Sequence, residues 1–86
     1  MVPLIVKRDS RLELYDPNKI IRVSQAAGLT EEQSKKLVEK ISSWLHSLSL
    51  EQLHSTKLRD KMVEEMHLLN KSAAHMFSWY QKTKEK

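Results

Sequence analysis

Residues that break helices are scarce in this chain, and their scarcity limits its possible folds more than any other feature. The 86 residues contain one glycine and two prolines. Tight turns between short strands use both residue types heavily, so a β sandwich or barrel would be expected to contain more of them. Long helices need neither. The sequence therefore predicts one small domain that is mostly helical.

The first fifteen residues are the part of the chain that favours strands. Residues 4–6 (Leu-Ile-Val) are rich in strand-forming side chains, and residues 12–15 (Leu-Glu-Leu-Tyr) alternate with a period of two. Between them, Asp9 and Ser10 form a turn pair. We expect a short hairpin over 3–15 with its tip near these two residues.

Capping residues and apolar spacing predict helices in the rest of the chain. The Asp-Pro pair at 16–17 suits an N-cap and a first helical position, and Gly28 suits a C-terminal stop, so the first helix is placed over 17–27. A capping box at 30–33 begins a second helix that runs to about residue 46.

Two further helices follow a segment, 47–54, whose structure the sequence leaves open. Ser55 and Thr56 are the expected caps of the third helix, Asn70 its end, and Ser72 the expected cap of the last helix. The apolar stripes of these two helices are Leu58, Met62, Val63, Met66 and Leu69, then Ala73, Ala74, Met76, Phe77, Trp79 and Tyr80. The predicted class is α+β and mostly helical.

Composition excludes several kinds of function. Without cysteine the chain holds neither a disulfide nor a thiolate zinc site, and none of its four histidines forms a helical i, i+4 pair. No nucleophile–base arrangement or paired carboxylates are visible, so we predict that the chain is not an enzyme. The apolar run at 2–6 is too short for a signal peptide or a membrane span, which favours a cytoplasmic protein without membrane contact.

A motif runs through the hairpin and the start of the first helix, at residues 6–9 (Val-Lys-Arg-Asp), 15–16 (Tyr-Asp) and 19–20 (Lys-Ile). It resembles the opening signature of ATP-cone domains, which reads Val, Lys-Arg-Asp-Gly, an aromatic residue, Asp or Asn, two residues, then Lys-Ile. Weaker similarities follow in the family's order at residues 27–29, 53–58 and 73–80.

The resemblance implies both a fold and a function. ATP-cone domains are regulatory modules of ribonucleotide reductases, where ATP activates and dATP inhibits by changing oligomeric assembly, and they also occur in a bacterial repressor of reductase genes. By similarity, 1–86 is a single domain with a β lid over 1–15, a four-helix bundle over 16–82 and a frayed tail over 83–86. The sequence shows no reductase barrel or kinase P-loop, so the regulated activity is expected in a larger enzyme or a partner, or in self-association.

The basic residues of the motif suit a triphosphate. Lys7 and Arg8 are adjacent, so they would point to opposite faces of a regular strand and reach one ligand only if the hairpin folds over it. Lys19 lies one turn into the first helix, where free N–H groups around 16–19 are expected to form an anion site. The alternative is a solvated basic turn with an ordinary surface lysine, and the resemblance favours the binding site.

Four more site residues come from the resemblance. Glu13 matches a family position that contacts the nucleoside, with a solvent-facing strand residue as the alternative. Ser55 matches a position whose hydroxyl lies at the site, with an N-cap role as the alternative. Asp16 is expected near the ligand as well as at the N-cap, and Ile20 near the base as well as in the core. The implied ligand is ATP or dATP, with Mg²⁺ arriving on the phosphate oxygens.

One departure from the family pattern leaves alternatives open. Ser10 stands where the family has a turn glycine, and serine adopts a positive φ at a cost of about 1 kcal/mol, so a tighter or differently turned lid is expected. This motivates an alternative function, a degenerate ATP-cone that binds proteins without nucleotide. Direct nucleic-acid binding ranks last, because the basic residues are dispersed among eleven acidic ones.

Overall fold

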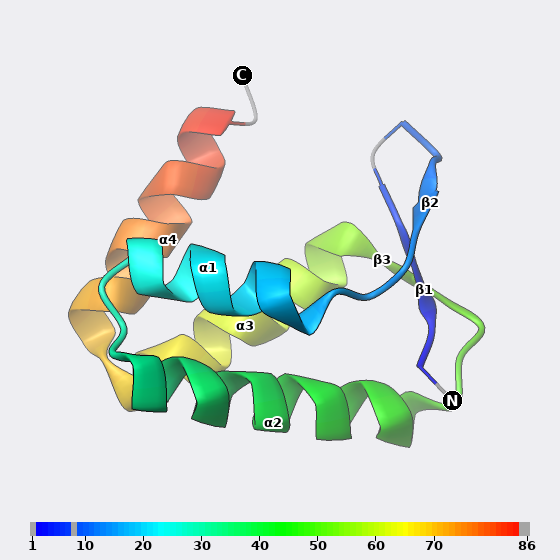
Figure 1. The fold of residues 1–86 in the computed structure, drawn as a ribbon. Coiled ribbons are helices and arrows are strands. Elements are labelled where there is room, and N and C mark those ends of the chain that lie inside the picture. Colours follow the sequence, from blue (N-terminus) through cyan, green and yellow to red (C-terminus); the bar gives the residue numbers. More distant parts are fainter. Residues whose placement is uncertain (1, 8, 85–86) are drawn as a thin grey trace.

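The computed structural model describes residues 2–7 and 9–84 (Figure 1). This part of the chain contains three short strands and four helices. In chain order they are β1 (Leu4–Val6), β2 (Leu12–Glu13), α1 (Pro17–Ala26), α2 (Glu31–Leu48), β3 (Gln52–His54), α3 (Ser55–Leu69) and α4 (Lys71–Lys84). The α+β, mostly helical class is therefore confirmed.

The sheet is built around β1. Strand β2 pairs with it antiparallel, with Val6 opposite Leu12, which confirms the expected hairpin. Strand β3 pairs with the other edge of β1 in parallel, with Ile5 opposite Leu53. Both of these residues are buried, so the small sheet contributes to the core. The segment that the sequence left open thus supplies a third strand.

The hairpin turn places Ser10 in the left-handed region, at φ 71°. The Ser10 N–H donates to the Lys7 carbonyl at 3.0 Å, and the Lys7 N–H donates to the Arg11 carbonyl at 2.8 Å. A hairpin connection of this kind ends on a left-handed residue, for which glycine is preferred. Serine therefore takes the conformation that glycine would take, and the turn retains the backbone strain of a positive φ.

We expect Ser10→Gly to stabilise the chain by about 0.5–1 kcal/mol, because relief of the positive φ exceeds the entropy that glycine adds to the unfolded state. For a chain of this length the midpoint of thermal unfolding, followed by circular dichroism, should rise by about 3–6 °C. Ser43→Gly, the same change within α2, should lower the midpoint instead. A Ser10→Gly variant that is also destabilised would contradict the strained turn.

The starts of α1 and α2 follow the predicted caps. The Asn18 N–H donates to Asp16 Oδ1 at 3.0 Å, with Pro17 at the first helical position. In the capping box, the Gln33 N–H donates to Thr30 Oγ1 at 3.1 Å and the Thr30 N–H donates to Gln33 Oε1 at 3.0 Å. These bonds satisfy N–H groups that a helix start leaves without partners. Helix α2 runs two residues further than predicted.

The expected cap of α3 is wrong. Ser55 is the first helical residue, and the N-cap is His54, whose Nδ1 accepts the Thr56 N–H at 3.3 Å. The reason is the unforeseen strand β3, which ends at His54 and leaves its backbone extended, as an N-cap requires. Because β3 leads into α3 without a loop, the first turn of α3 is fixed directly against the sheet.

The expected cap of α4 is wrong as well. Asn70 ends α3 as predicted, but its Oδ1 also accepts the Ala73 N–H at 3.2 Å, so the next helix begins at once and Ser72 lies within its first turn. One asparagine therefore serves two helix ends. Helix α4 continues to Lys84, and residues 85–86 lie outside the described part of the chain.

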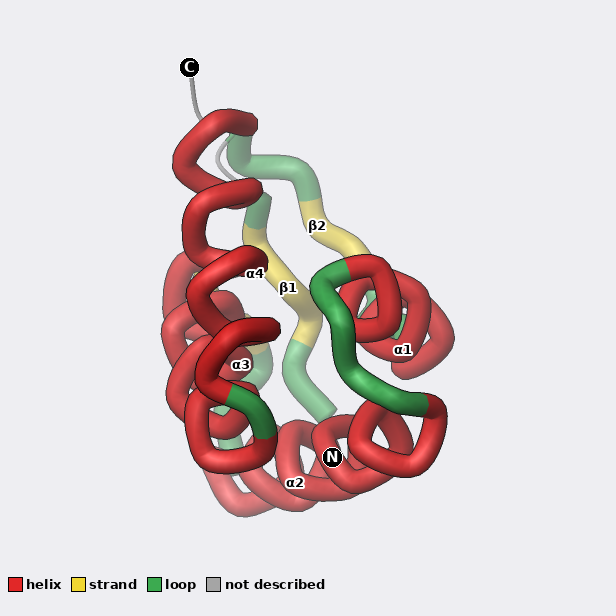
Figure 2. Tube along the Cα trace, turned by 90° about the vertical axis from the view of Figure 1, so that its left-hand side faces the viewer, coloured by secondary structure: helices red, strands yellow, loops and turns green. Residues whose placement is uncertain are grey.

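The core is formed where α1 and α3 each pack against α2 and where α4 packs against α3. Its most completely buried apolar side chains are Leu37, Ile41, Leu45 and Met66. Met62, also expected in the core, is 5% exposed. Figures 1 and 2 show that α1 and α3 both begin beside the sheet, because β2 and β3 lead into them. No helix in the described part of the chain combines the length and apolarity needed to cross a membrane.

The apolar stripe expected in α4 is only partly buried. Ala73, Ala74 and Phe77 lie in the core, whereas Met76 and Trp79 are 54% and 61% exposed. Helix α4 packs chiefly against α3 and extends away from the rest of the bundle, so one narrow face is covered (Figure 2). The expectation of a buried Trp79 is therefore wrong.

Candidate functional site

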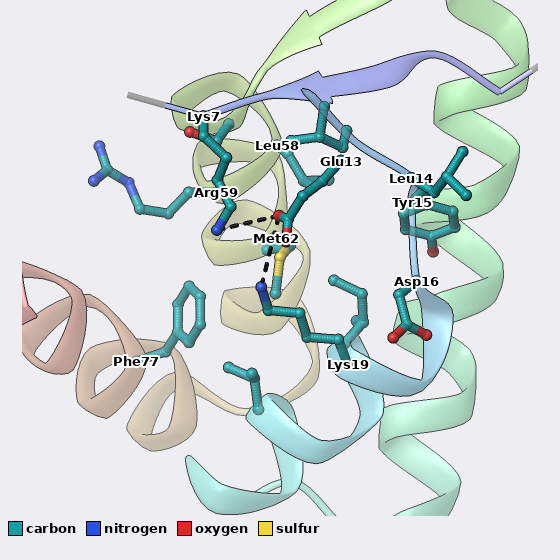
Figure 3. Close-up of a pocket in the computed structure, with 14 residues that line it drawn as sticks. Lys7, Glu13, Leu14, Tyr15, Asp16, Lys19, Leu58, Arg59, Met62 and Phe77 are labelled. Carbon is teal, nitrogen blue, oxygen red and sulfur yellow. Dashed lines mark ion pairs between the residues drawn. The ribbon is translucent and has the colours of Figure 1, made fainter. Parts of the chain in front are cut away.

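A cavity of about 570 Å³ lies between the sheet and helices α1, α3 and α4 (Figure 3). Its lining has a polar and an apolar part. The polar residues are Lys7, Glu13, Asp16, Lys19, Ser55 and Arg59. The apolar residues include Ile5, Ile20, Val23, Leu58, Met62 and Phe77. The volume lies in the range of small-molecule sites, which are mostly apolar with a few placed polar groups.

The residues expected at a binding site converge on this cavity. Six of them line it, from the β1–β2 turn, β2, the β2–α1 linker, α1 and α3: Lys7, Glu13, Asp16, Lys19, Ile20 and Ser55. Arg8, the remaining expected residue, lies outside the described residues. Convergence shows that these side chains share one surface, and what they bind stays a prediction.

Glu13 lies between the two lysines of the cavity. Its Oε2 is 3.1 Å from Lys7 Nζ and 4.0 Å from Lys19 Nζ, as the dashed lines in Figure 3 show. The hydrogen bond from Lys7 lowers the pKa of the Glu13 carboxyl below its usual value, with further lowering by the charge of Lys19. Glu13 is therefore ionised at neutral pH. Strand and helix thus meet through an ion-pair cluster at the mouth of the cavity.

The start of α1 does not offer the free N–H groups that were expected around residues 16–19. Pro17 has no N–H, the Asn18 N–H is bonded to Asp16 Oδ1, and the Lys19 N–H donates to the Asp16 carbonyl at 3.2 Å. The Asp-Pro cap that begins the helix therefore satisfies its own donors. An anion at this end of the cavity would be held by the Lys19 ammonium rather than by the backbone.

Tyr15, the aromatic residue of the motif, anchors the linker between β2 and α1. Its hydroxyl lies 3.0 Å from Ser42 Oγ of α2, and burial raises the pKa of the phenol, with a smaller opposing effect of that hydrogen bond. The anchor holds the chain on both sides of it, so Glu13 and Asp16 are positioned by a contact with α2. The motif's aromatic residue thus has a structural role beside the cavity.

The polar lining favours an anion over a bare metal ion. Among the described lining residues, three cations (Lys7, Lys19 and Arg59) face two carboxylates (Glu13 and Asp16). No cluster of three His, Asp or Glu side chains suited to a metal occurs in the described part of the chain. A divalent cation would thus be expected here only in company with an anionic ligand.

Beyond Ser55, sequence reasoning missed the residues that α3 and α4 contribute to the cavity. Arg59 lines the cavity with its side chain 29% exposed and its Nη2 3.8 Å from Asp60 Oδ1. It stands four residues after Ser55, and that helical spacing could have placed both on one face. Phe77 and Met62 belong to the apolar stripes of α4 and α3, and such stripes indicate burial rather than a site. They are buried, and they also form the apolar wall of the cavity.

No protein-family model matches the chain. The chain is 26% identical over 78 residues to the transcriptional repressor NrdR of Petrotoga mobilis, a match that covers 86% of this chain and 52% of that protein. The chain thus spans about half the length of the curated relative that it matches. This similarity lends distant support to the ATP-cone resemblance.

Proposed function

We propose that the chain is a regulatory module that binds a purine nucleoside triphosphate, ATP or dATP, and couples occupancy to self-association or to docking of a partner. The observation that carries this proposal is the convergence of Lys7 and Lys19, from different elements, on one cavity with an apolar wall. A nucleotide has two parts that match these features, because its phosphates are polyanionic and its base is aromatic.

The cavity's chemistry supports the placement of each part of the ligand. The phosphates would lie at the charged mouth, where Lys7 and Lys19 act as point charges and Arg59 offers a planar fork. The base would lie against the apolar wall, near Ile20 and Phe77. Mg²⁺ would be held mainly by phosphate oxygens. The negative charge that remains on the magnesium–triphosphate complex would be matched by the small excess of positive charge in the lining.

The proposed regulatory role depends on which elements form the walls of the cavity. They come from the sheet, α1, α3 and α4, so a ligand that contacts all of them stabilises one arrangement of these elements over others. A partner or second copy that binds only that arrangement would be coupled to the nucleotide by the same free energy. The purine and the regulatory role rest on the ATP-cone resemblance, and the matched relative is itself named a repressor.

Calorimetric titration of the chain with ATP, dATP and CTP, each with Mg²⁺, tests this proposal. We expect saturable binding of the two purine nucleotides, and at a hundred times the dissociation constant they should stabilise the fold by about 2.7 kcal/mol. Sedimentation with and without nucleotide then reports the coupled assembly. Absence of binding at millimolar nucleotide would refute the proposal. Oligomers whose formation does not depend on nucleotide would favour the protein-interaction alternative.

A further inference from the structure

The carboxylate of Glu13 lies where an anionic ligand would need to bind. A single oxygen, Oε2, is within 4.0 Å of the ammonium groups of both Lys7 and Lys19. Lys7 directly follows β1 and Lys19 lies in α1, so the carboxylate of β2 joins two parts of the chain that are separate in sequence. The anion that the structure places between the two cations is therefore the protein's own.

A phosphate oxygen and a carboxylate oxygen compete for the same donors. Both are anionic acceptors that form charge-assisted bonds to ammonium groups at similar distances. If Glu13 stayed in place, its charge would lie a few ångströms from the incoming phosphate and repel it. The side chain is 47% exposed on the edge strand β2, so it has solvent into which it can turn.

The other charged groups around Glu13 do not remove this conflict. Arg11, on the same hairpin, carries a positive charge that adds to the attraction on the Glu13 carboxylate, but its Nε is bonded to Asp9. Asp16 is held by its capping bond, and Arg59 lines the cavity from α3. Glu13 is thus the carboxylate that competes directly for both lysines.

We propose, on the basis of the nucleotide-binding function above, that Glu13 is an internal competitor that occupies the phosphate position until a polyphosphate displaces it. Binding is then an exchange of one anion for another across Lys7 and Lys19. The exchange sets the lowest polyphosphate concentration to which the module responds. It also means that the lid is held to α1 in the free protein by Glu13 and in the bound protein by the ligand.

Inorganic tripolyphosphate is the probe that isolates this exchange, because it lacks the nucleoside that Glu13 is also expected to contact. Glu13→Gln keeps the shape of the side chain and removes its charge. We expect tripolyphosphate to bind this variant about fivefold more tightly than the native chain, the effect of removing two partly exposed ion pairs. Calorimetry at low ionic strength avoids screening of the difference.

Asp9→Asn is the matched control, since it removes the same charge from the same hairpin at a carboxylate that pairs with Arg11 and does not line the cavity. It should leave tripolyphosphate affinity within about twofold of the native value. If the affinity of Glu13→Gln for tripolyphosphate rises no more than that of this control while the native chain binds ATP, the competition is refuted and the proposed nucleotide site stands. If neither chain binds ATP or tripolyphosphate, both proposals fail.

A second measurement follows Glu13 itself. In the free chain the hydrogen bond from Lys7 holds the pKa of the Glu13 carboxyl below its ordinary value. Displacement by tripolyphosphate removes that bond and places negative charge nearby, so the pKa should rise. Carbon-detected NMR titration of the carboxyl, with and without saturating tripolyphosphate, reports the change. A pKa that stays lowered in the complex would show that Glu13 keeps its lysines and would overturn the proposal.

Discussion

Lys7→Ala/Lys19→Ala is expected to lower the affinity for ATP by at least about a hundredfold. Each lysine would make a charge-assisted contact to phosphate that contributes about 1.5–3 kcal/mol, and every 1.4 kcal/mol is a factor of ten. The lower end applies, because the two side chains are 33% and 51% exposed and water competes for them. Calorimetric titration of the variant with ATP and Mg²⁺ measures the loss.

The control for this variant must remove two lysine charges from a surface outside the cavity. Lys36→Ala/Lys40→Ala does so on the exposed face of α2, away from the cavity, and should change ATP affinity less than about threefold through the general field of the protein. Both variants should unfold near the native temperature, because the replaced residues lie at the surface. An equal loss in the two variants would point to net charge alone and would remove the argument for a built site.

Much of the candidate site could be predicted because its motif is short and continuous. Residues 6–20 run from the last residue of β1 through the turn and β2 into the first turn of α1, so the sequence itself keeps Lys7, Glu13 and Lys19 close together. The turn, the Asp-Pro cap and the alternation each have local physical causes that are readable without a structure. The expected backbone anion site at the start of α1 was wrong, because Asp16 accepts the N–H groups that were expected to hold the anion.

The distant half of the site could not be predicted in the same way. Strand β3 is three residues long and pairs with β1, 48 residues earlier in the chain, so its strand character comes from a partner rather than from its own pattern. Missing β3 then misplaced the cap of α3. For Phe77, helical spacing predicted burial but could not show that the buried face borders a cavity, because that depends on how α4 packs against α3.

The largest expected effect on stability belongs to Phe77, which is 3% exposed and ties α4 to the core. Phe77→Ala removes most of a buried aromatic side chain and leaves a space that α4 cannot easily close, so the free energy of unfolding should fall by about 3–5 kcal/mol. A chain of 86 residues has a free energy of unfolding of about 4–13 kcal/mol, so the variant should lose much of its stability. Urea unfolding followed by circular dichroism measures the change.

Met76→Ala is the matched control, because Met76 is the preceding residue of α4 and is 54% exposed. Its substitution should change the free energy of unfolding by less than about 0.5 kcal/mol. A similar small effect at both positions would mean that α4 does not pack through Phe77. Because Phe77 also lines the cavity, ATP should stabilise Phe77→Ala less than it stabilises Met76→Ala at equal concentration. Stabilisation by ATP that is equal in both variants would place the ligand away from the apolar wall.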